Sequence, residues 1–116
     1  MAYDESLADR VRHVLAGEPG LSERKMFGGL AFMLGGNMCC GIVGDRLMLR
    51  LGADLAEKAL ERTNVHQMDF TGRPMTGMVY VAPGGVRGRA LRTWVEKAAG
   101  FARTLPPKHP RASATG

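Results

Sequence analysis

The chain has 116 residues and a mass of 12.5 kDa, a length at which we expect one domain. Hydrophobic residues make up 45% of it, enough to fill a core without disulfide or metal staples. Its longest apolar runs, such as Leu30–Leu34, are far shorter than the roughly 20 residues that span a bilayer. The N-terminus lacks the basic and apolar regions of a signal peptide. Composition therefore predicts a cytoplasmic domain and argues against membrane-spanning and secreted classes.

The first half of the chain predicts one helix followed by three strands. The helix is Glu5–Ala16, with Asp4 as its N-cap, and its apolar residues recur at helical spacing: Leu7, Val11, Val14 and Leu15. Beyond it, glycines separate short apolar runs that we interpret as strands: Leu30–Leu34, Met38–Val43 and Arg46–Leu51. The links between them have the composition of tight hairpin turns, so the three strands should form an antiparallel meander.

The second half predicts a short helix at Ala53–Arg62 and strands at Val65–Phe70 and Gly77–Val81, joined by a turn at Thr71–Pro74. A last helix carries a long apolar stripe, which consists of Leu91, Trp94, Val95, Ala98, Phe101, Ala102 and Leu105. The predicted order is α-β-β-β-α-β-β-α. This order indicates a two-layer α+β sandwich, an antiparallel sheet of about five strands with three helices on one face. We expect the domain to cover residues 1–107 and the polar residues 108–116 to be a disordered basic tail.

Methionine is the unusual residue of this sequence, because seven of the eight methionines fall in the predicted sheet region. The sheet face without helices would carry Met33, Met38 and Met48. An apolar face of this kind needs a partner, so the sequence predicts a homodimer. Methionine also fills gaps in cores, and that alternative stays open.

The sequence offers no constellation for catalysis or metal binding. Cys39 and Cys40, as neighbours in a strand, should point to opposite faces and so cannot share a metal ion. The three histidines are scattered, no nucleophile stands beside a base, and no glycine pair opens a helix as a phosphate cradle requires. We therefore expect no catalytic residues, no metal and no cofactor. Two unpaired cysteines are typical of a reducing compartment.

Two groups of polar residues are candidates for binding. Arg73 precedes Pro74, which restricts it to extended or turn conformations, so its guanidinium could hold an acidic partner; a solvated turn arginine is the alternative. Residues 86–116 carry a net charge of +6. This charge predicts weak nucleic-acid binding, with a solvated helix face as the alternative. The candidate nucleic-acid-binding residues are Arg87, Arg89, Arg92, Lys97, Arg103 and Lys108.

Several segments in combination carry a resemblance to a known family. They are Lys25–Gly29, Phe32-Met33, Gly36–Gly41, Asp45–Leu47, Met68–Phe70, Gly72–Met75 and Trp94-Val95. Over about residues 3–107, the chain resembles the N-terminal domain of the TfoX/Sxy family in a single-domain form.

The resemblance implies a fold similar in topology to type III secretion chaperones. Two-domain members of the family regulate natural competence in bacteria, acting with the cyclic-AMP receptor protein at promoters of DNA-uptake genes. We therefore expect a non-enzymatic regulatory or adaptor domain that acts by protein–protein contact, with transcription machinery among its candidate partners. The positions that match the family motifs are the candidate partner-binding residues: Met26, Phe27, Arg73, Pro74 and Met75. Direct nucleic-acid binding is the alternative function.

Overall fold

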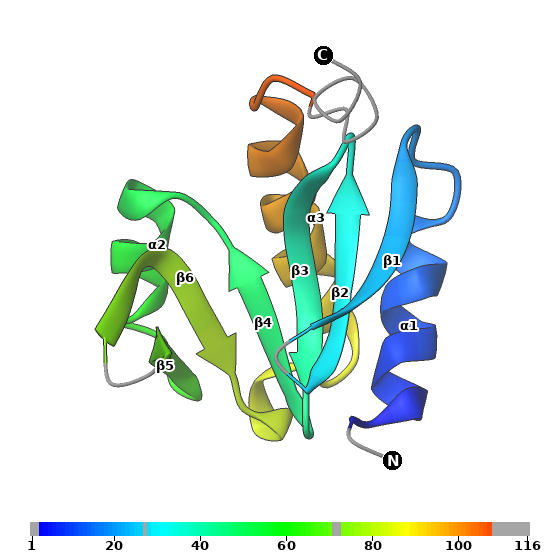
Figure 1. Cartoon of the computed structure of the whole chain (residues 1–116). Coiled ribbons are helices and arrows are strands. Elements are labelled where there is room, and N and C mark those ends of the chain that lie inside the picture. Colours follow the sequence, from blue (N-terminus) through cyan, green and yellow to red (C-terminus); the bar gives the residue numbers. More distant parts are fainter. Residues whose placement is uncertain (1–2, 27, 71–72, 108–116) are drawn as a thin grey trace.

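The computed structural model describes residues 3–107, apart from residues 27, 71 and 72. One antiparallel sheet of six strands has three helices on one of its faces (Figure 1). The helices are α1 (Glu5–Leu15), α2 (Ala53–Ala59) and α3 (Arg89–Arg103), and the one-turn helix η1 (Pro83–Gly85) precedes α3. The strands are β1 (Leu21–Met26), β2 (Gly29–Leu34), β3 (Asn37–Val43), β4 (Arg46–Arg50), β5 (Val65–Phe70) and β6 (Arg73–Val81).

The predicted α+β class and its two layers are confirmed, but the sheet has six strands instead of about five. The additional strand is β1, which pairs antiparallel with β2 at the edge of the sheet. Four of its six residues are exposed, so Leu21–Met26 shows no apolar alternation by which a strand could be predicted. The predicted turn at Thr71–Pro74 extends too far along the chain, because Arg73 and Pro74 already belong to β6.

The order of strands across the sheet is β1-β2-β3-β4-β6-β5. The predicted meander is therefore confirmed for β2, β3 and β4. After β4 the chain leaves the sheet to form α2 and returns as a β5–β6 hairpin, whose second strand pairs with β4. This crossover places α2 against β6, on the same side of the sheet as α3 (Figure 1).

Two hydrogen bonds of Asp4 explain where α1 begins and hold its first turn against the rest of the domain. The side chain of Asp4 accepts a hydrogen bond of 3.1 Å from the backbone N–H of Leu7, which is the N-cap predicted from the sequence. The backbone N–H of Asp4 also donates to the carbonyl oxygen of Gly44 at 2.7 Å. The start of α1 is thus anchored to the turn between β3 and β4.

The two faces of the sheet contain different side chains. On the helix side, Leu47, Leu49 and other aliphatic residues join the apolar sides of all three helices in the main core. On the opposite face, Met48, Met68, Met78 and Tyr80 form a second, smaller buried cluster, against which Met38 packs. Met33 is the register partner of Met38, so the prediction that Met33, Met38 and Met48 share the face without helices is confirmed.

Ion pairs link α1 to the edge strand β1 and the end of α3 to the loop between α1 and β1. On α1, the Arg12 Nε and one terminal nitrogen donate to the two carboxylate oxygens of Glu23 in β1, at 2.6 and 2.9 Å. Near the end of α3, the Arg103 Nε donates to the Glu18 carboxylate at 3.2 Å. The hydrogen bonds from these arginines lower the pKa of both Glu23 and Glu18.

We expect Glu23→Gln to lower the free energy of unfolding by about 0.5 kcal/mol near neutral pH, a value that allows for solvent screening of this partly exposed pair. Because the pKa of Glu23 is lower in the folded protein, the pair stabilises the fold above the unfolded pKa of roughly 4.3, and this stabilisation is lost as the pH falls through the folded pKa. The difference between wild type and variant should therefore shrink progressively as the pH falls below roughly 4.3. Urea unfolding at several pH values measures it.

The matched control is Glu57→Gln on α2, since none of the ion pairs in the described part of the chain involves Glu57. A difference for Glu23→Gln that did not depend on pH would show that the ion pair contributes nothing to stability.

Candidate functional site

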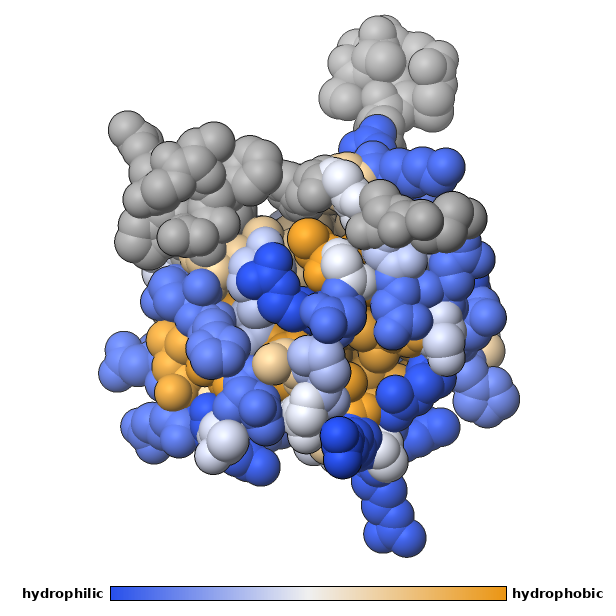
Figure 2. Space-filling view, turned by 90° about the horizontal axis from the view of Figure 1, so that it is seen from below, coloured by the Kyte–Doolittle hydropathy of each residue, from blue (hydrophilic) through white to orange (hydrophobic). Residues whose placement is uncertain are grey.

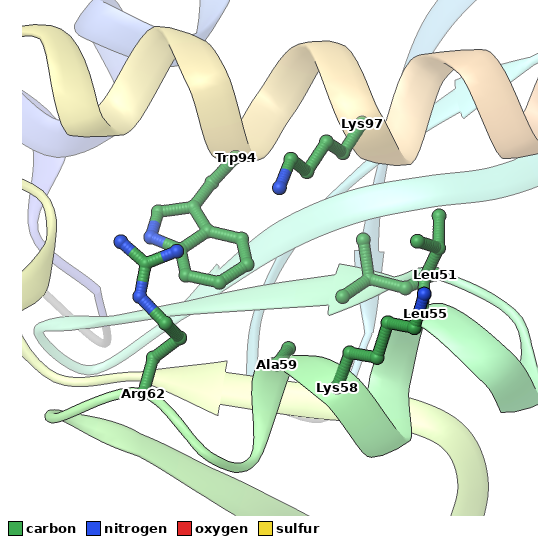
Figure 3. A pocket seen from close by; sticks show the side chains of 7 residues that line it. All are labelled: Leu51, Leu55, Lys58, Ala59, Arg62, Trp94 and Lys97. Carbon is green, nitrogen blue, oxygen red and sulfur yellow. The ribbon is translucent and has the colours of Figure 1, made fainter.

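A small hollow lies between α2 and α3 (Figure 3). Its volume is about 100 Å³. Leu51 comes from the segment just after β4, four residues come from α2 and the turn after it, and two come from α3. The lining residues are Leu51, Leu55, Lys58, Ala59, Arg62, Trp94 and Lys97.

The inner part of the hollow is apolar. Trp94 and Arg62 lie at one end, Leu51 and Leu55 lie at the other, and Ala59 lies between them (Figure 3). Trp94 is 7% exposed and belongs to the main core, together with the small side chain of Ala59. Leu55 is 41% exposed. The floor of the hollow is therefore fixed by the core, whereas one of its walls is a leucine that remains open to solvent.

The outer part of the hollow is cationic. The guanidinium carbon of Arg62 lies 5.8 Å from the centre of the Trp94 ring, and the Lys97 Nζ lies 5.4 Å from it. Both distances are within the range of a cation–π interaction. Lys58 adds a third positive charge from α2, and none of the lining residues is acidic. The site thus combines an apolar hollow with a rim of positive charge.

A second, wider groove lies on the other side of α3, where its first turn meets α1. It has a volume of about 400 Å³ and is lined by Arg10, His13, Val14, Gly88, Arg89, Leu91 and Arg92. The Arg10 guanidinium donates a 2.7 Å hydrogen bond to the carbonyl oxygen of Val86, which fixes it beside the start of α3. Figure 2 views the molecule from the end at which α3 begins, and hydrophilic side chains cover most of that surface.

The structure divides the predicted nucleic-acid-binding residues between these two sides of α3. Arg89 and Arg92 line the α1–α3 groove, whereas Lys97 lies at the α2–α3 hollow. Arg103 is paired with Glu18, and Arg92 approaches Glu96 at 3.5 Å. Arg87 is exposed just before α3, and Lys108 lies outside the described residues. Those of the six that the structure describes are therefore spread over both sides and both ends of α3, and their role in nucleic-acid binding stays a prediction.

The predicted partner-binding residues lie elsewhere. Met26 is half-buried at the end of β1, and Phe27 lies outside the described residues. The backbone of Arg73, Pro74 and Met75 belongs to β6, and the structure describes no side chain there. Their role in binding stays a prediction.

The prediction that Cys39 and Cys40 point to opposite faces of the sheet is wrong. Phe32 is the register partner of Cys40, while its neighbour Met33 is the partner of Met38, so Cys39 is an extra residue in β3. Such a bulge interrupts the alternation of side chains, and both thiols are buried in the main core on the helix side. The hydrogen bond with Cys39, together with burial, raises the pKa of the Cys40 thiol well above its usual value.

The described part of the chain contains no group of three or more His, Cys, Asp or Glu side chains that could hold a metal ion. None of the helices described is long and apolar enough to cross a membrane.

Comparison with known proteins places the chain in a family. A family model described as the TfoX N-terminal domain matches residues 13–102. The chain belongs to the TfoX N-terminal domain family. This family is of a regulatory type, and the match confirms the resemblance seen in the sequence. Neither the curated proteins nor the solved structures contain a match to this TfoX N-terminal domain.

The α2–α3 hollow of this TfoX N-terminal domain was not predicted from the sequence. In the sequence, Trp94 belongs to the apolar stripe of the last helix and to a family segment, and neither pattern indicates a hollow beside it. The signal that could have found the site is the spacing of Leu55, Lys58 and Arg62, which places two cations on the same side of a helix as an apolar residue. The approach of this side to Trp94 is a tertiary contact that no local pattern shows.

We expect Cys39 and Cys40 to be unreactive towards DTNB in the folded protein, because both side chains are buried and the hydrogen bond with Cys39, together with burial, raises the pKa of the Cys40 thiol. Their labelling should be at least about a hundredfold slower than in denaturant, since it requires the core to open. An added thiol at the exposed position of Ser22 (Ser22→Cys) is the control and should react at once. Rapid labelling of two thiols in the native wild-type protein would contradict the burial of this pair.

Proposed function

We propose that this TfoX N-terminal domain is a non-enzymatic regulatory or adaptor domain that acts by protein–protein contact through the α2–α3 hollow. The observation that carries the proposal is the exposure of Leu55. Among the described residues the exposed large hydrophobic side chains are Leu55 and Leu60, on α2 and its C-cap, and of these two only Leu55 lines the hollow. An exposed hydrophobic side chain in the wall of an apolar hollow is a feature of protein contact sites.

The size of the hollow also favours a protein partner. Pockets for cofactors and drug-sized ligands have roughly 300–1,000 Å³, several times the volume of about 100 Å³ found here. A cavity of roughly 150 Å³ holds a benzene-sized molecule. The hollow therefore has room for one apolar side chain of a partner, and such a buried side chain is the usual anchor of a protein interface.

We expect tagged wild-type protein to retain a protein partner from lysate of the source organism, and nuclease treatment should not release this partner. Leu55→Ser should lose the partner, because it removes an apolar wall of the hollow. Leu60→Ser is the matched control: it makes the same change at the end of the same helix, outside the hollow, and should keep the partner. Mass spectrometry of the retained proteins provides the measurement. Equal retention by both variants would exclude the α2–α3 hollow as the contact site.

The α1–α3 groove supports nucleic-acid binding as a second candidate function. Arg10, His13, Arg89 and Arg92 gather there from two helices, and no acidic residue lines the groove. Arginines of this kind contact phosphates and release counterions from nucleic acid. Trp94, at 7% exposure, offers no open ring on which a base could stack, so such binding would depend on charge.

For this second function we expect weak binding to duplex DNA with a slope of log K against log salt of roughly −2 to −3, because three arginines neutralise about three phosphates. Arg89→Glu should abolish the binding, whereas Lys97→Glu, which makes the same charge change on the other side of α3, should reduce it only slightly. Fluorescence anisotropy with a labelled duplex measures both. Equal losses for the two variants would show that net charge, and not this groove, attracts the DNA.

A further inference from the structure

We infer that the partner of the α2–α3 hollow is an acidic protein segment, which inserts one bulky apolar side chain between Leu55 and Trp94 and places its carboxylates against Lys58, Arg62 and Lys97. This inference rests on the proposed function and adds the chemistry of the partner. It follows from three properties of the hollow: its positive charge, its size and the small exposure of its aromatic ring.

The cations of the rim have no ion-pair partner within the described part of the chain. The ion pairs found there use Arg12, Arg92 and Arg103, and none involves a cation of the rim. Asp54 and Glu61 stand four residues before and three residues after Lys58, at helical spacings that permit pairing. Neither forms an ion pair with it. Three cations thus remain available to a negatively charged partner.

The positions of these cations match a partner that brings both carboxylates and an apolar side chain. Lys58 and Arg62 project from the α2 side, while Lys97 projects from α3, so the positive charges flank the opening from both helices (Figure 3). An apolar side chain in the hollow would lie on the floor formed by Leu51, Ala59 and Trp94. Acidic residues before and after it would then meet the rim. Complementary charge of this kind increases the association rate and selects the partner.

The same features disfavour the other occupants. In a symmetric pairing of two α2–α3 hollows, the three cations of one copy would face those of the other, in a chain whose net charge is already +5. A nucleic acid would satisfy the cations, but it would leave Leu55 against a polar backbone. Trp94 is too little exposed to stack with a base. An acidic protein segment satisfies both the apolar and the charged parts of the site.

Trp94 allows a direct test, because it is the only tryptophan of the chain and lies in the hollow. The probe is an acidic peptide of about 12–15 residues, with leucines one helical turn apart among Asp and Glu. We expect it to change the emission of Trp94 with saturation, and raising the salt from about 50 to about 500 mM should weaken the binding about tenfold. In the matched peptides, the leucines become serine or the acidic residues become their amides. Both should lose at least about tenfold in affinity.

Variants of the protein show whether the peptide occupies the hollow. Lys58→Glu and Lys97→Glu should each weaken peptide binding about tenfold. Arg89→Glu makes the same charge change on α3 outside the hollow and should weaken it less than about twofold. Thermal unfolding of each variant confirms that it remains folded. Leu55→Ser inside the hollow and Leu60→Ser outside it test the apolar part of the site in the same way, without changing the charge.

Three results would overturn the inference: an unchanged Trp94 emission, equal binding of the amide peptide, or equal effects of Lys97→Glu and Arg89→Glu. A labelled oligonucleotide that bound as tightly as the peptide, with the same dependence on Lys58, would assign the hollow to phosphates instead. These results are distinct from a failure of the proposed function. If Leu55→Ser still released the lysate partner while the acidic peptide did not bind, protein contact at the hollow would stand and the acidic chemistry of the partner would be wrong.

Discussion

The packing of α3 on the sheet is the contact on which the other features of the helix layer depend. Its buried residues are Leu91, Trp94, Val95, Ala98, Ala99 and Ala102, and three of these are alanines. Small side chains allow a helix to lie close to the sheet, so the larger side chains must point to its flanks. Leu91 lies on the flank that faces α1, and Trp94 lies on the flank that faces α2. The two grooves beside α3 therefore result from the way in which a single helix is packed.

Trp94 connects the core of the molecule with the proposed contact site. Its ring is buried to more than nine-tenths, so the core fixes its position, while Arg62 and Lys97 lie within 6 Å of its centre. Without a partner, these cations interact with the ring and with water. The carboxylates of an acidic partner would replace part of their hydration and supply a counter-charge, while the ring stays in place. The site needs little rearrangement in the rest of the domain, and binding of this kind loses little conformational entropy.

The parts of the fold that could be predicted from the sequence are those with a strong local pattern. Leu47, Leu49 and Leu51 alternate with polar or thioether residues, and this period of two predicted β4 and its inward face. β1 has no such pattern because an edge strand buries little of its surface. The bulge at Cys39 depends on the register between two strands, which no single segment encodes. The α2–α3 hollow likewise depends on a crossover that brings Leu55 to Trp94, and only the structure shows it.

The burial of the methionines on the opposite sheet face supports the proposal that the contact site lies on the helix side. Met48, Met68 and Met78 are almost fully buried although no helix covers them, because they pack on one another and on Tyr80. The guanidinium of Arg46 covers the Tyr80 ring, with its carbon 4.1 Å from the ring centre. Flexible thioethers can close a shallow surface in this way. The homodimer was predicted because an apolar sheet face without helices would need a partner. The burial of these methionines weakens that reason, and the homodimer stays a prediction. Among the described residues the large hydrophobic side chains that remain exposed are those of α2 and its C-cap, and a partner gains most by covering Leu55 beside Trp94.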